Sequence, residues 1–266
     1  MQIEHSTIQL QAIHELIQDN YFNDGQFTCY FLRQGVNDTY EIHHNNGKKY
    51  FLRFNRAHRF LPYNLDSYQF EHNFLFHLQQ ELNTIAIPVK MISTSTVGQC
   101  NLKEGVRYFA LYEEARGNVN YPLSNIQMNL LGQELAKVHQ KANTFSTPLQ
   151  RFEIKENLVH QVIQQLDHFK SFLNSSDIQF LKKLAKVFLK NSESKLKDCS
   201  TTIVHGDLWW DNIHWESPNE LTFIDFDFCV RQIVPTITPI QILTSAGDYF
   251  IFRLKVCHQC FQIPFF

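Results

Sequence analysis

The sequence has few of the residues and patterns that mark chains without a folded core. Its 266 residues include only 9 glycines and 8 prolines, and 24 Lys and Arg nearly balance 26 Asp and Glu, for a net charge of −2. This composition excludes a collagen-like fibre, an intrinsically disordered chain and a polybasic nucleic-acid binder. The pattern G-x-x-x-x-G-K-[ST] does not occur, which argues against a P-loop nucleotidase.

Leader and membrane segments are not expected either. The N-terminus has no basic start followed by an apolar run, and the most apolar late stretch, Ile233–Phe252, is interrupted by two prolines and an aspartate. Six cysteines without a secretion signal are expected to be reduced thiols. The lone C-x-x-C at Cys257–Cys260 has no second pair with which to bind zinc. We therefore expect a cytoplasmic protein with no membrane partner.

Aromatic rings, in contrast, are abundant. The chain has 24 Phe, 10 Tyr and 3 Trp, 14% of its residues, which predicts a large buried core in one sizeable domain or two lobes. The last 38 residues differ from the rest, because only four of them are charged and they hold three of the six cysteines. The composition therefore changes near residue 228.

The order of predicted elements divides the chain into three parts. Residues 1–113 are expected to form a β-rich lobe, with helices at 8–20 and 66–82 and a hairpin turn at Asn46-Gly47. Its strands are expected at 27–32, 40–44, 50–54, 89–93 and 108–112. Residues 114–228 are expected to form a mainly helical lobe after a hinge near Gly117, and residues 229–266 an atypical tail. The helices of the second lobe are expected at 124–138, 153–173 and 176–190.

The segment Thr201–Phe228, TTIVHGDLWWDNIHWESPNELTFIDFDF, carries the candidate chemistry. If residues 213–216 pair with 221–224 across a four-residue loop, Ile213 faces Ile224, and Asn212 meets Asp225 at the open end of the hairpin. Asp207 lies on the loop before the hairpin. Asp227 is expected to point to the same side as Asp225 while the chain stays extended. Hard oxygen ligands of this kind suit Mg²⁺.

The order of these residues matches the chemistry of phosphoryl transfer. In kinases an aspartate accepts the hydroxyl proton, an asparagine five residues later binds metal, and a later aspartate also binds metal. Asp207, Asn212 and Asp225 follow that order, with the same first spacing. The structural alternative is that His-Gly-Asp forms a turn and that the Asp and Asn side chains cap strand ends. The whole constellation favours the functional interpretation.

The motifs HGDLWWDN and FIDFD resemble the H-G-D-x-x-x-x-N and I-D-F-D signature of the aminoglycoside phosphotransferase and choline kinase-like family. The resemblance covers about residues 25–228 in element order, with its specific motifs in 203–228. It implies an α+β, protein-kinase-like fold of two lobes that binds ATP and Mg²⁺. By this resemblance Asp207 is the catalytic base, and Asn212 and Asp225 bind the metal. His205 supports the loop, or is simply a buried histidine satisfied by the backbone, and Asp227 is a further supporting residue.

The first lobe offers candidates for binding the nucleotide. A kinase needs a cation on its third strand, steadied by a glutamate on the following helix, and Arg53 and Glu71 have these places. The alternative for this pair is an ordinary salt bridge. The resemblance puts Tyr112 and Glu113 where family members hold adenine through backbone groups. The loop at 33–39, RQGVNDT, joins two predicted strands and has a single glycine.

The main hypothesis is an ATP- and Mg²⁺-dependent phosphotransferase that acts on a hydroxyl of a small molecule. The acceptor class stays open among aminoglycosides, choline, homoserine and sugars, and the oligomeric state is equally open. Trp209 and Trp210 are candidates for stacking on a sugar or a quaternary amine, with core packing as the alternative. Lysines on the outer face of the predicted helix 176–190 are interpreted as a solvated surface and not as a nucleic-acid site.

Two further hypotheses follow from the same residues. The tail after IDFD lacks a clear amphipathic helix, where the family completes its C-lobe, which predicts an incomplete C-lobe in a truncated or altered chain. The protein would then be a catalytically impaired, nucleotide-binding remnant. A metal-dependent phosphohydrolase would use the same carboxylates, but it leaves Arg53 and Glu71 unexplained.

Overall fold

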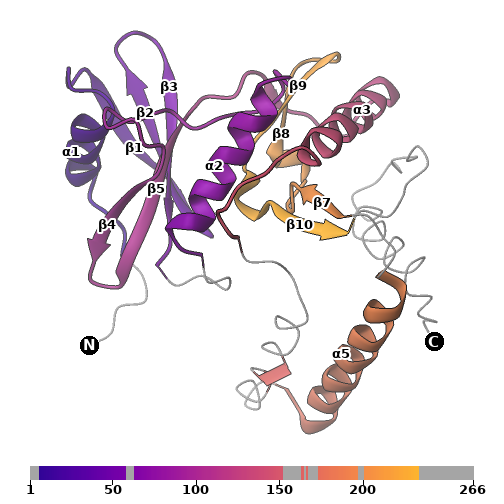
Figure 1. Ribbon diagram of the computed structural model, residues 1–266. Coiled ribbons are helices and arrows are strands. Elements are labelled where there is room, and N and C mark those ends of the chain that lie inside the picture. The colour runs from indigo at the N-terminus through magenta and orange to yellow at the C-terminus, as the bar shows by residue number, and fades with distance from the viewer. Residues whose placement is uncertain are drawn as a thin grey trace. The chain divides into compact units, whose positions relative to one another are not determined.

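Figure 1 shows the computed structural model of the chain, which describes residues 6–57, 63–151, 163–164, 166, 173–196 and 201–233. The helices are α1 (Leu10–Asn20), α2 (Leu65–Gln79), α3 (Asn125–Ala142) and α5 (Ser175–Leu196), with short 3₁₀ helices η2 (Trp210–Asn212) and η3 (Phe226–Phe228). The strands are β1 (Phe27–Gln34), β2 (Asn37–His44), β3 (Lys49–Asn55), β4 (Gly98–Leu102), β5 (Gly105–Glu113), β6 (Asn118–Val119), β7 (Thr201–Val204), β8 (Ile213–Ser217), β9 (Glu220–Phe223) and β10 (Val230–Ile233). The predicted helix at 153–173, apart from a few residues, and the tail from 234 onward lie outside the described residues.

The chain forms two compact units, each assembled from separate segments. The first contains Met1–Tyr121, Glu134–Phe152 and His205–Cys229. The second contains Pro122–Gln133, Glu153–Val204 and Val230–Phe266. Every residue of the candidate site belongs to the first unit. The lobe boundaries expected from the sequence, at 113 and 228, stay a prediction.

An antiparallel five-stranded sheet, in the order β1-β2-β3-β5-β4, is the frame of the first unit. β3 lies in its centre, where Arg53 is opposite Thr39 of β2 and Ala110 of β5. Because side chains alternate along a strand, Leu52 and Phe54 point to one face of the sheet and Arg53 to the other. The central strand therefore contributes both to the hydrophobic core and to a polar face.

Helix α1 covers the apolar face of the sheet. Ile13 and Ile17, one helical turn apart, are fully buried against Tyr40, Ile42 and Leu52. Burial of an aliphatic side chain contributes about 1.5–3 kcal/mol. Figure 1 shows α1 and α2 on opposite faces of the sheet, so that α2 covers the polar face.

Helix α2 begins at a capping box. The Asn64 side chain accepts a hydrogen bond of 3.0 Å from the Ser67 backbone N–H, and the Ser67 hydroxyl accepts one from the Asn64 N–H. The buried side of the helix carries Glu71 toward Arg53. It also packs Phe74 against Phe226, with ring centroids 6.2 Å apart. α2 thus connects the sheet with the segment that follows β9.

Most local predictions in this part are confirmed, including the turn at Asn46-Gly47, but the strand expected at 89–93 is wrong. Pro88 makes only an isolated bridge to Tyr112 of β5, and the Val89 N–H donates to the Leu111 carbonyl at 2.7 Å. The chain then turns, because the Met91 N–H donates to the Ser95 carbonyl at 2.7 Å and Thr94 has φ of 72°. The strand that pairs with β5 is β4, a few residues later.

The hairpin of β8 and β9 exists, but its predicted register is wrong. The loop has two residues, 218–219, in place of four, and Ile213 lies opposite Phe223 in place of Ile224. An irregularity between Trp215 and Ser217 absorbs the remaining residue. β6 pairs with β8 and completes a three-stranded sheet, β6-β8-β9.

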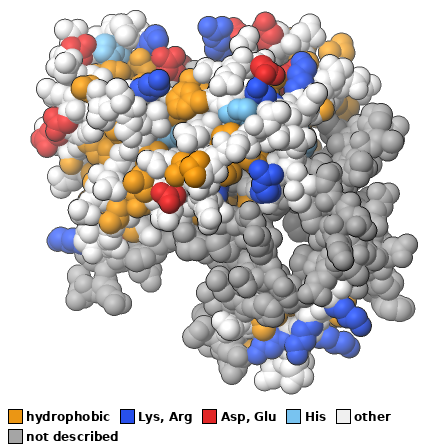
Figure 2. All heavy atoms as spheres, viewed as in Figure 1, with side chains coloured by type: hydrophobic (Ala, Val, Ile, Leu, Met, Phe, Trp, Pro, Cys, Tyr) orange, Lys and Arg blue, Asp and Glu red, His pale blue; other side chains and the backbone are white. Residues whose placement is uncertain are grey.

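The second unit contains the antiparallel pair β7 and β10, with Val204 opposite Val230. Helix α5 buries Ile178 and exposes Lys183 and Lys186. Figure 2 shows Lys and Arg side chains gathered over this helix. Within the described ranges, no helix has both the length and the apolar character needed to cross a membrane.

Candidate active site

His205 anchors the loop that carries the predicted catalytic aspartate. Its ring is buried, its Nε2–H donates to the Ile224 carbonyl at 2.9 Å, and its Nδ1 accepts the Asp207 backbone N–H at 3.3 Å. Burial lowers the pKa of His205 to about 4, so the ring is neutral at pH 7. Gly206 follows with φ of 85°, and a Cβ there would collide with the carbonyl oxygen of Phe228. Only glycine fits this position.

Asp207 and Asn212 are held together by the short loop between them. The Asn212 backbone N–H donates to the Trp209 carbonyl at 3.0 Å, which closes η2. The Asn212 side-chain Nδ2 donates to the Asp207 carbonyl at 2.8 Å and to Asp207 Oδ2 at 3.3 Å. Asn212 is buried and Asp207 is exposed. The five-residue spacing thus fixes the asparagine amide beside an accessible carboxylate.

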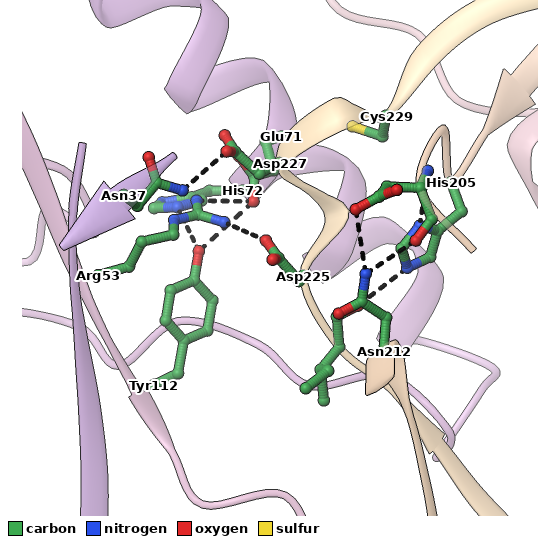
Figure 3. A network of polar contacts seen from close by, with 12 residues as sticks. Asn37, Arg53, Glu71, His72, Tyr112, His205, Asn212, Asp225, Asp227 and Cys229 are labelled. Atoms are coloured by element: carbon green, nitrogen blue, oxygen red, sulfur yellow. Dashed lines mark hydrogen bonds and ion pairs between the residues drawn. The ribbon is translucent and has the colours of Figure 1, made fainter. Parts of the chain in front are cut away.

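Asp225 and Asp227 follow β9 in a bent segment and not in the extended one predicted from the sequence. Asp225 has a left-handed backbone, with φ of 59° and ψ of 62°, and Asp227 lies in η3. A left-handed residue other than glycine is uncommon, and such residues concentrate at functional sites. Asp227 is buried, and its Oδ2 accepts a hydrogen bond of 2.9 Å from Nδ2 of Asn37, the first residue of β2 (Figure 3).

Arg53 joins α2 to the segment that follows β9. Its Nη2 is 2.8 Å from Glu71 Oε1 and its Nη1 is 3.2 Å from Asp225 Oδ1 (Figure 3). Burial opposes the charge of Arg53, but the nearby acidic groups, led by Glu71, raise the pKa of its guanidinium well above the ordinary value. Burial also disfavours the charged form of Asp225, which raises the pKa of this carboxyl group. Arg53 opposes that rise, while Asp227, Glu71 and Asp207 add to it.

Tyr112 stands beside these ion pairs. The guanidinium carbon of Arg53 lies 5.1 Å from the centroid of its ring, within cation–π distance. The Tyr112 hydroxyl is 3.1 Å from His72 Nε2 and 3.5 Å from Glu71 Oε1. Burial lowers the pKa of His72, and the charges of Arg53 and Arg151 lower it further, so the ring is neutral.

Glu113, the neighbour predicted with Tyr112, has a different environment. Its carboxylate is exposed and pairs with Lys48 at 2.8 Å, away from the buried network. The Glu113 backbone faces Tyr50 in the ladder between β3 and β5. The side chain of Tyr112 therefore takes part in the polar network, and that of Glu113 does not.

A cavity of about 1060 Å³ opens beside these groups. Most of the residues predicted for the site lie in its wall, namely Arg53, Tyr112, Glu113, Asp207, Asn212, Asp225 and Asp227. Glu71 and His205 stand behind that wall, where each holds a residue that reaches it. The fold thus brings the proposed base, metal ligands and phosphate-binding cation to one cavity.

The two adjacent tryptophans differ in their surroundings. Trp209 lines the cavity, and its ring centroid is 3.6 Å from that of Trp210. Trp210 also packs on Tyr121, with centroids 4.9 Å apart. Trp209 therefore lies in the cavity wall with its ring against Trp210, and the choice between ligand stacking and core packing stays open.

Two residues that contact the site went unnoticed in the sequence. Asn37 lies in the segment 33–39, which the sequence predicts as a loop. The structure leaves only residues 35–36 between β1 and β2, and Asn37 is the first residue of β2. Arg151 is buried beside Glu71 and Asp227. No local pattern marks it, because its contacts lie about eighty residues away on either side of it in the sequence.

The donor set fits a divalent cation that has phosphate and water as further ligands. Among the residues that the structure describes, no group of three or more His, Cys, Asp and Glu side chains converges on a metal position. Asn212 and Asp225, the metal ligands expected from the resemblance, would supply two oxygen donors, and Mg²⁺ often takes only one or two ligands from protein. The carboxylates of Asp207, Asp225 and Asp227 line the wall with Arg53. Burial raises the pKa of Asp225 and the neighbouring carboxylates raise it further, so a cation bound beside them would favour the charged form of Asp225.

Comparisons with solved structures identify the fold. The amicoumacin kinase hAmiN, in complex with AMP-PNP, Ca²⁺ and Ami, is similar with a TM-score of 0.70 and 18% identity, over 97% of this chain and 79% of that one. A microcompartment-associated aminopropanol kinase has a TM-score of 0.62 and 16% identity, over 84% and 70%. A spectinomycin phosphotransferase has a TM-score of 0.56 and 17% identity, over 85% and 71%. The predicted α+β, protein-kinase-like fold is confirmed.

Comparisons at the level of sequence give the family. The protein sll1119 of Synechocystis sp., whose name assigns no activity, is 26% identical over 232 residues, which are 85% of this chain and 62% of that protein. The chain thus spans less than two thirds of the length of this relative. The model of the phosphotransferase enzyme family matches residues 31–233. Because that match takes in most of the sequence and all the residues of the cavity wall named above, the chain belongs to the phosphotransferase enzyme family.

Proposed function

We propose that the protein is an ATP- and Mg²⁺-dependent phosphotransferase that moves the γ-phosphoryl group of ATP to a hydroxyl of a small molecule. One observation carries the proposal. The ion pairs of Arg53 with Glu71 and Asp225 meet the hydrogen-bonded pair of Asp207 and Asn212 at a single cavity. A structural salt bridge alone gives no reason for an accessible aspartate and an oriented amide beside it.

Asp207 is the base in this proposal. Its carboxylate is exposed to the cavity, and its backbone is fixed by His205 and Asn212. It accepts the proton of the acceptor hydroxyl while the hydroxyl oxygen forms a bond to the γ-phosphorus. The bond from that phosphorus to the β,γ-bridging oxygen breaks, and ADP leaves. A general base positioned in this way contributes about 10²–10⁴-fold to the rate.

Asn212 and Asp225 are the proposed ligands of Mg²⁺. Because Asn212 Nδ2 donates hydrogen bonds to Asp207, the amide oxygen Oδ1 is the atom left to bind Mg²⁺. When bound, Mg²⁺ neutralises the negative charge of the phosphates during transfer. Arg53 holds phosphate oxygens through the forked donors of its guanidinium, and Glu71 keeps that guanidinium in place.

The solved structures support a nucleotide and a divalent cation as the molecules bound at the site. The amicoumacin kinase was solved with AMP-PNP and Ca²⁺, an ATP analogue and a divalent cation. An aminoglycoside 2'-phosphotransferase with a TM-score of 0.57 was solved with GDP, so GTP belongs in any test beside ATP. The acceptors named for these proteins are antibiotics and an amino alcohol, which are small molecules with hydroxyl groups.

The test measures release of ADP or GDP with a panel of amino alcohols, aminoglycosides and sugars. The protein is compared with Asp207→Asn, which removes the base and keeps the shape of the side chain. Asp24→Asn, at an exposed carboxylate in the turn before β1, is the matched control. We expect Asp207→Asn to lose about 10²-fold or more in kcat, with nucleotide affinity nearly unchanged. Equal activity of the Asp207 variant and the control would remove the proposed role of Asp207.

The alternatives predict other outcomes of the same assay. A nucleotide-binding remnant binds MgATP and gives no phosphorylated product with any acceptor. A phosphohydrolase releases phosphate to water from substrates other than nucleotides, and its rate does not depend on Arg53. Loss of transfer in Arg53→Met, with hydrolysis of simple phosphate esters absent in both proteins, favours the phosphotransferase.

A further inference from the structure

Arg151 is a buried guanidinium in the segment that follows α3. Its side chain is 2% exposed. Nη1 donates to the Ser67 carbonyl of α2 at 3.2 Å and lies 3.5 Å from Glu71 Oε2. Nη2 donates to the Asp227 carbonyl in η3. One side chain therefore contacts both α2 and the segment after β9.

The contacts of Glu71 give Arg151 a particular place in the network. Glu71 is completely buried, and its two oxygens face different guanidinium groups. Oε1 is 2.8 Å from Arg53 Nη2, and Oε2 is 3.5 Å from Arg151 Nη1. The carboxylate thus bridges the cation at the cavity and a second cation behind it. A buried carboxylate held from both sides has little freedom to turn away from Arg53.

Both terminal nitrogens of Arg151 have acceptors. They are two backbone carbonyls and a carboxylate, spread over α2 and η3. The Cys229 sulfur lies 3.5 Å from Nη1, and the guanidinium carbon lies 4.6 Å from the centroid of the Tyr63 ring. A lysine keeps the charge, but a single ammonium on a flexible stem does not reproduce this planar set of donors.

We propose that Arg151 is a positioning residue for phosphoryl transfer. It ties α2 to the segment Asp225–Cys229, and it thereby fixes Glu71, Arg53 and Asp225 in the arrangement that receives the phosphates. The inference rests on the function proposed above. Arg151 does not line the cavity and does not touch the substrates itself.

The test replaces Arg151 by lysine and uses a second buried arginine as the control. Arg107 is fully buried on β5, where it binds Asp38 at 2.7 Å and the Asn55 carbonyl at 2.7 Å, away from the cavity wall. Arg107→Lys therefore loses a guanidinium of equal burial in the same unit. Urea unfolding of both variants establishes that each is folded under the assay conditions.

The thiol of Cys229 reports on the segment independently of activity. It is completely buried and contacts Arg151. A variant in which Cys229 is the only cysteine, the other five being serine, is treated with a thiol reagent under native conditions. Arg151→Lys and Arg107→Lys are introduced into this background, and the modification rates are compared with and without MgATP.

We expect Arg151→Lys to lower kcat about tenfold or more, with a change in the KM for MgATP of less than about threefold. Modification of Cys229 rises about tenfold in this variant, and MgATP slows it. Arg107→Lys is expected to change neither quantity by more than about twofold, although its unfolding midpoint falls. The two variants then differ in their effect on the active site and not merely in their effect on stability.

Equal effects of the two variants on kcat and on Cys229 would overturn the inference, because Arg151 would then be only a stabilising residue. If the protein without any substitution shows no phosphoryl transfer, the proposed function fails. If Arg151→Lys still exposes Cys229 in that case, Arg151 is shown to order the segment Asp225–Cys229. If transfer falls and Cys229 stays protected, the coupling of α2 to that segment is refuted.

Discussion

Burial of His205 gives the stability of the protein a pH dependence with a definite sign. The folded ring is neutral because burial lowers its pKa to about 4, whereas a histidine in an unfolded chain has a pKa of about 6.5. Between these two values the unfolded chain binds a proton that the folded protein does not. The contribution of neutral His205 to the free energy of unfolding is therefore fully present above about pH 6.5 and is lost as the pH falls toward 4.

The size of this effect follows from linkage. The full shift corresponds to a free energy of unfolding on the order of 3 kcal/mol, and about 2 kcal/mol of it is lost between pH 7 and pH 4.5. Other groups titrate in the same range, so His205 is isolated by comparison with His205→Gln. Glutamine keeps a donor for the Ile224 carbonyl and cannot be protonated. Urea unfolding at several pH values gives the two free energies.

We expect the free energy of unfolding to fall by about 2 kcal/mol more in the unmodified protein than in His205→Gln between pH 7 and pH 4.5. The ring signals of His205 in NMR spectra should also stay constant down to about pH 5, because the ring stays neutral. Parallel pH profiles of the two proteins, or a ring that titrates near its ordinary pKa, would refute the reasoning.

Three further substitutions test the backbone and the charges. Gly206→Ala is expected to lower the free energy of unfolding by about 3 kcal/mol or more, since a Cβ collides with the Phe228 carbonyl. The control Gly47→Ala, at a similar positive φ with open space, should lower it by only about 1–2 kcal/mol, and equal midpoints of the two variants in urea would contradict this account. Asp225→Asn should abolish MgATP-dependent transfer. The melting temperature of the nucleotide-free variant should stay the same or rise, because the raised pKa of Asp225 shows that its charged form is disfavoured in the folded state and because asparagine tolerates the left-handed backbone; a lower melting temperature would contradict this reasoning. Arg107→Met should cost about 3–5 kcal/mol, because it removes the guanidinium that pairs with the buried carboxylate of Asp38. A calorimetric loss below about 1 kcal/mol would show that this ion pair is dispensable.

The fold was most predictable where neighbours in sequence decide the structure. Asn46-Gly47 specifies its turn by backbone preference alone, and apolar residues spaced by three or four mark α1 and α2. The error at 89–93 has the opposite origin. Its apolar residues resemble a strand, and Met91 is indeed buried, but Met91 packs from a loop that turns at Thr94. Burial pattern alone does not distinguish these two cases.

The site was predictable in proportion to how local its contacts are. Asp207 and Asn212 share one loop, so their spacing in sequence translates directly into a hydrogen bond. The pairing of Arg53 with Glu71 needed an assumption about the fold, and the structure places them 2.8 Å apart. Arg151 carries no signal of its own, because a single arginine gains meaning only from the two distant segments between which it lies.

The segment around Asp225 shows how a wrong register still leads to the right residues. The predicted hairpin puts Asn212 opposite Asp225. In the structure, the Ile224 N–H donates to the Asn212 carbonyl at 3.0 Å instead. A shift of one residue turns side chains to the opposite face of a strand, so an extended Asp225 would point away from Asn212. The left-handed backbone at Asp225 and the turn of η3 redirect the chain, and both Asp225 and Asp227 reach the cavity. The IDFD sequence therefore forms a strained bend and not a strand with alternating carboxylates. The bend brings the carbonyl of Phe228, the residue after IDFD, so close to Gly206 that only glycine fits there.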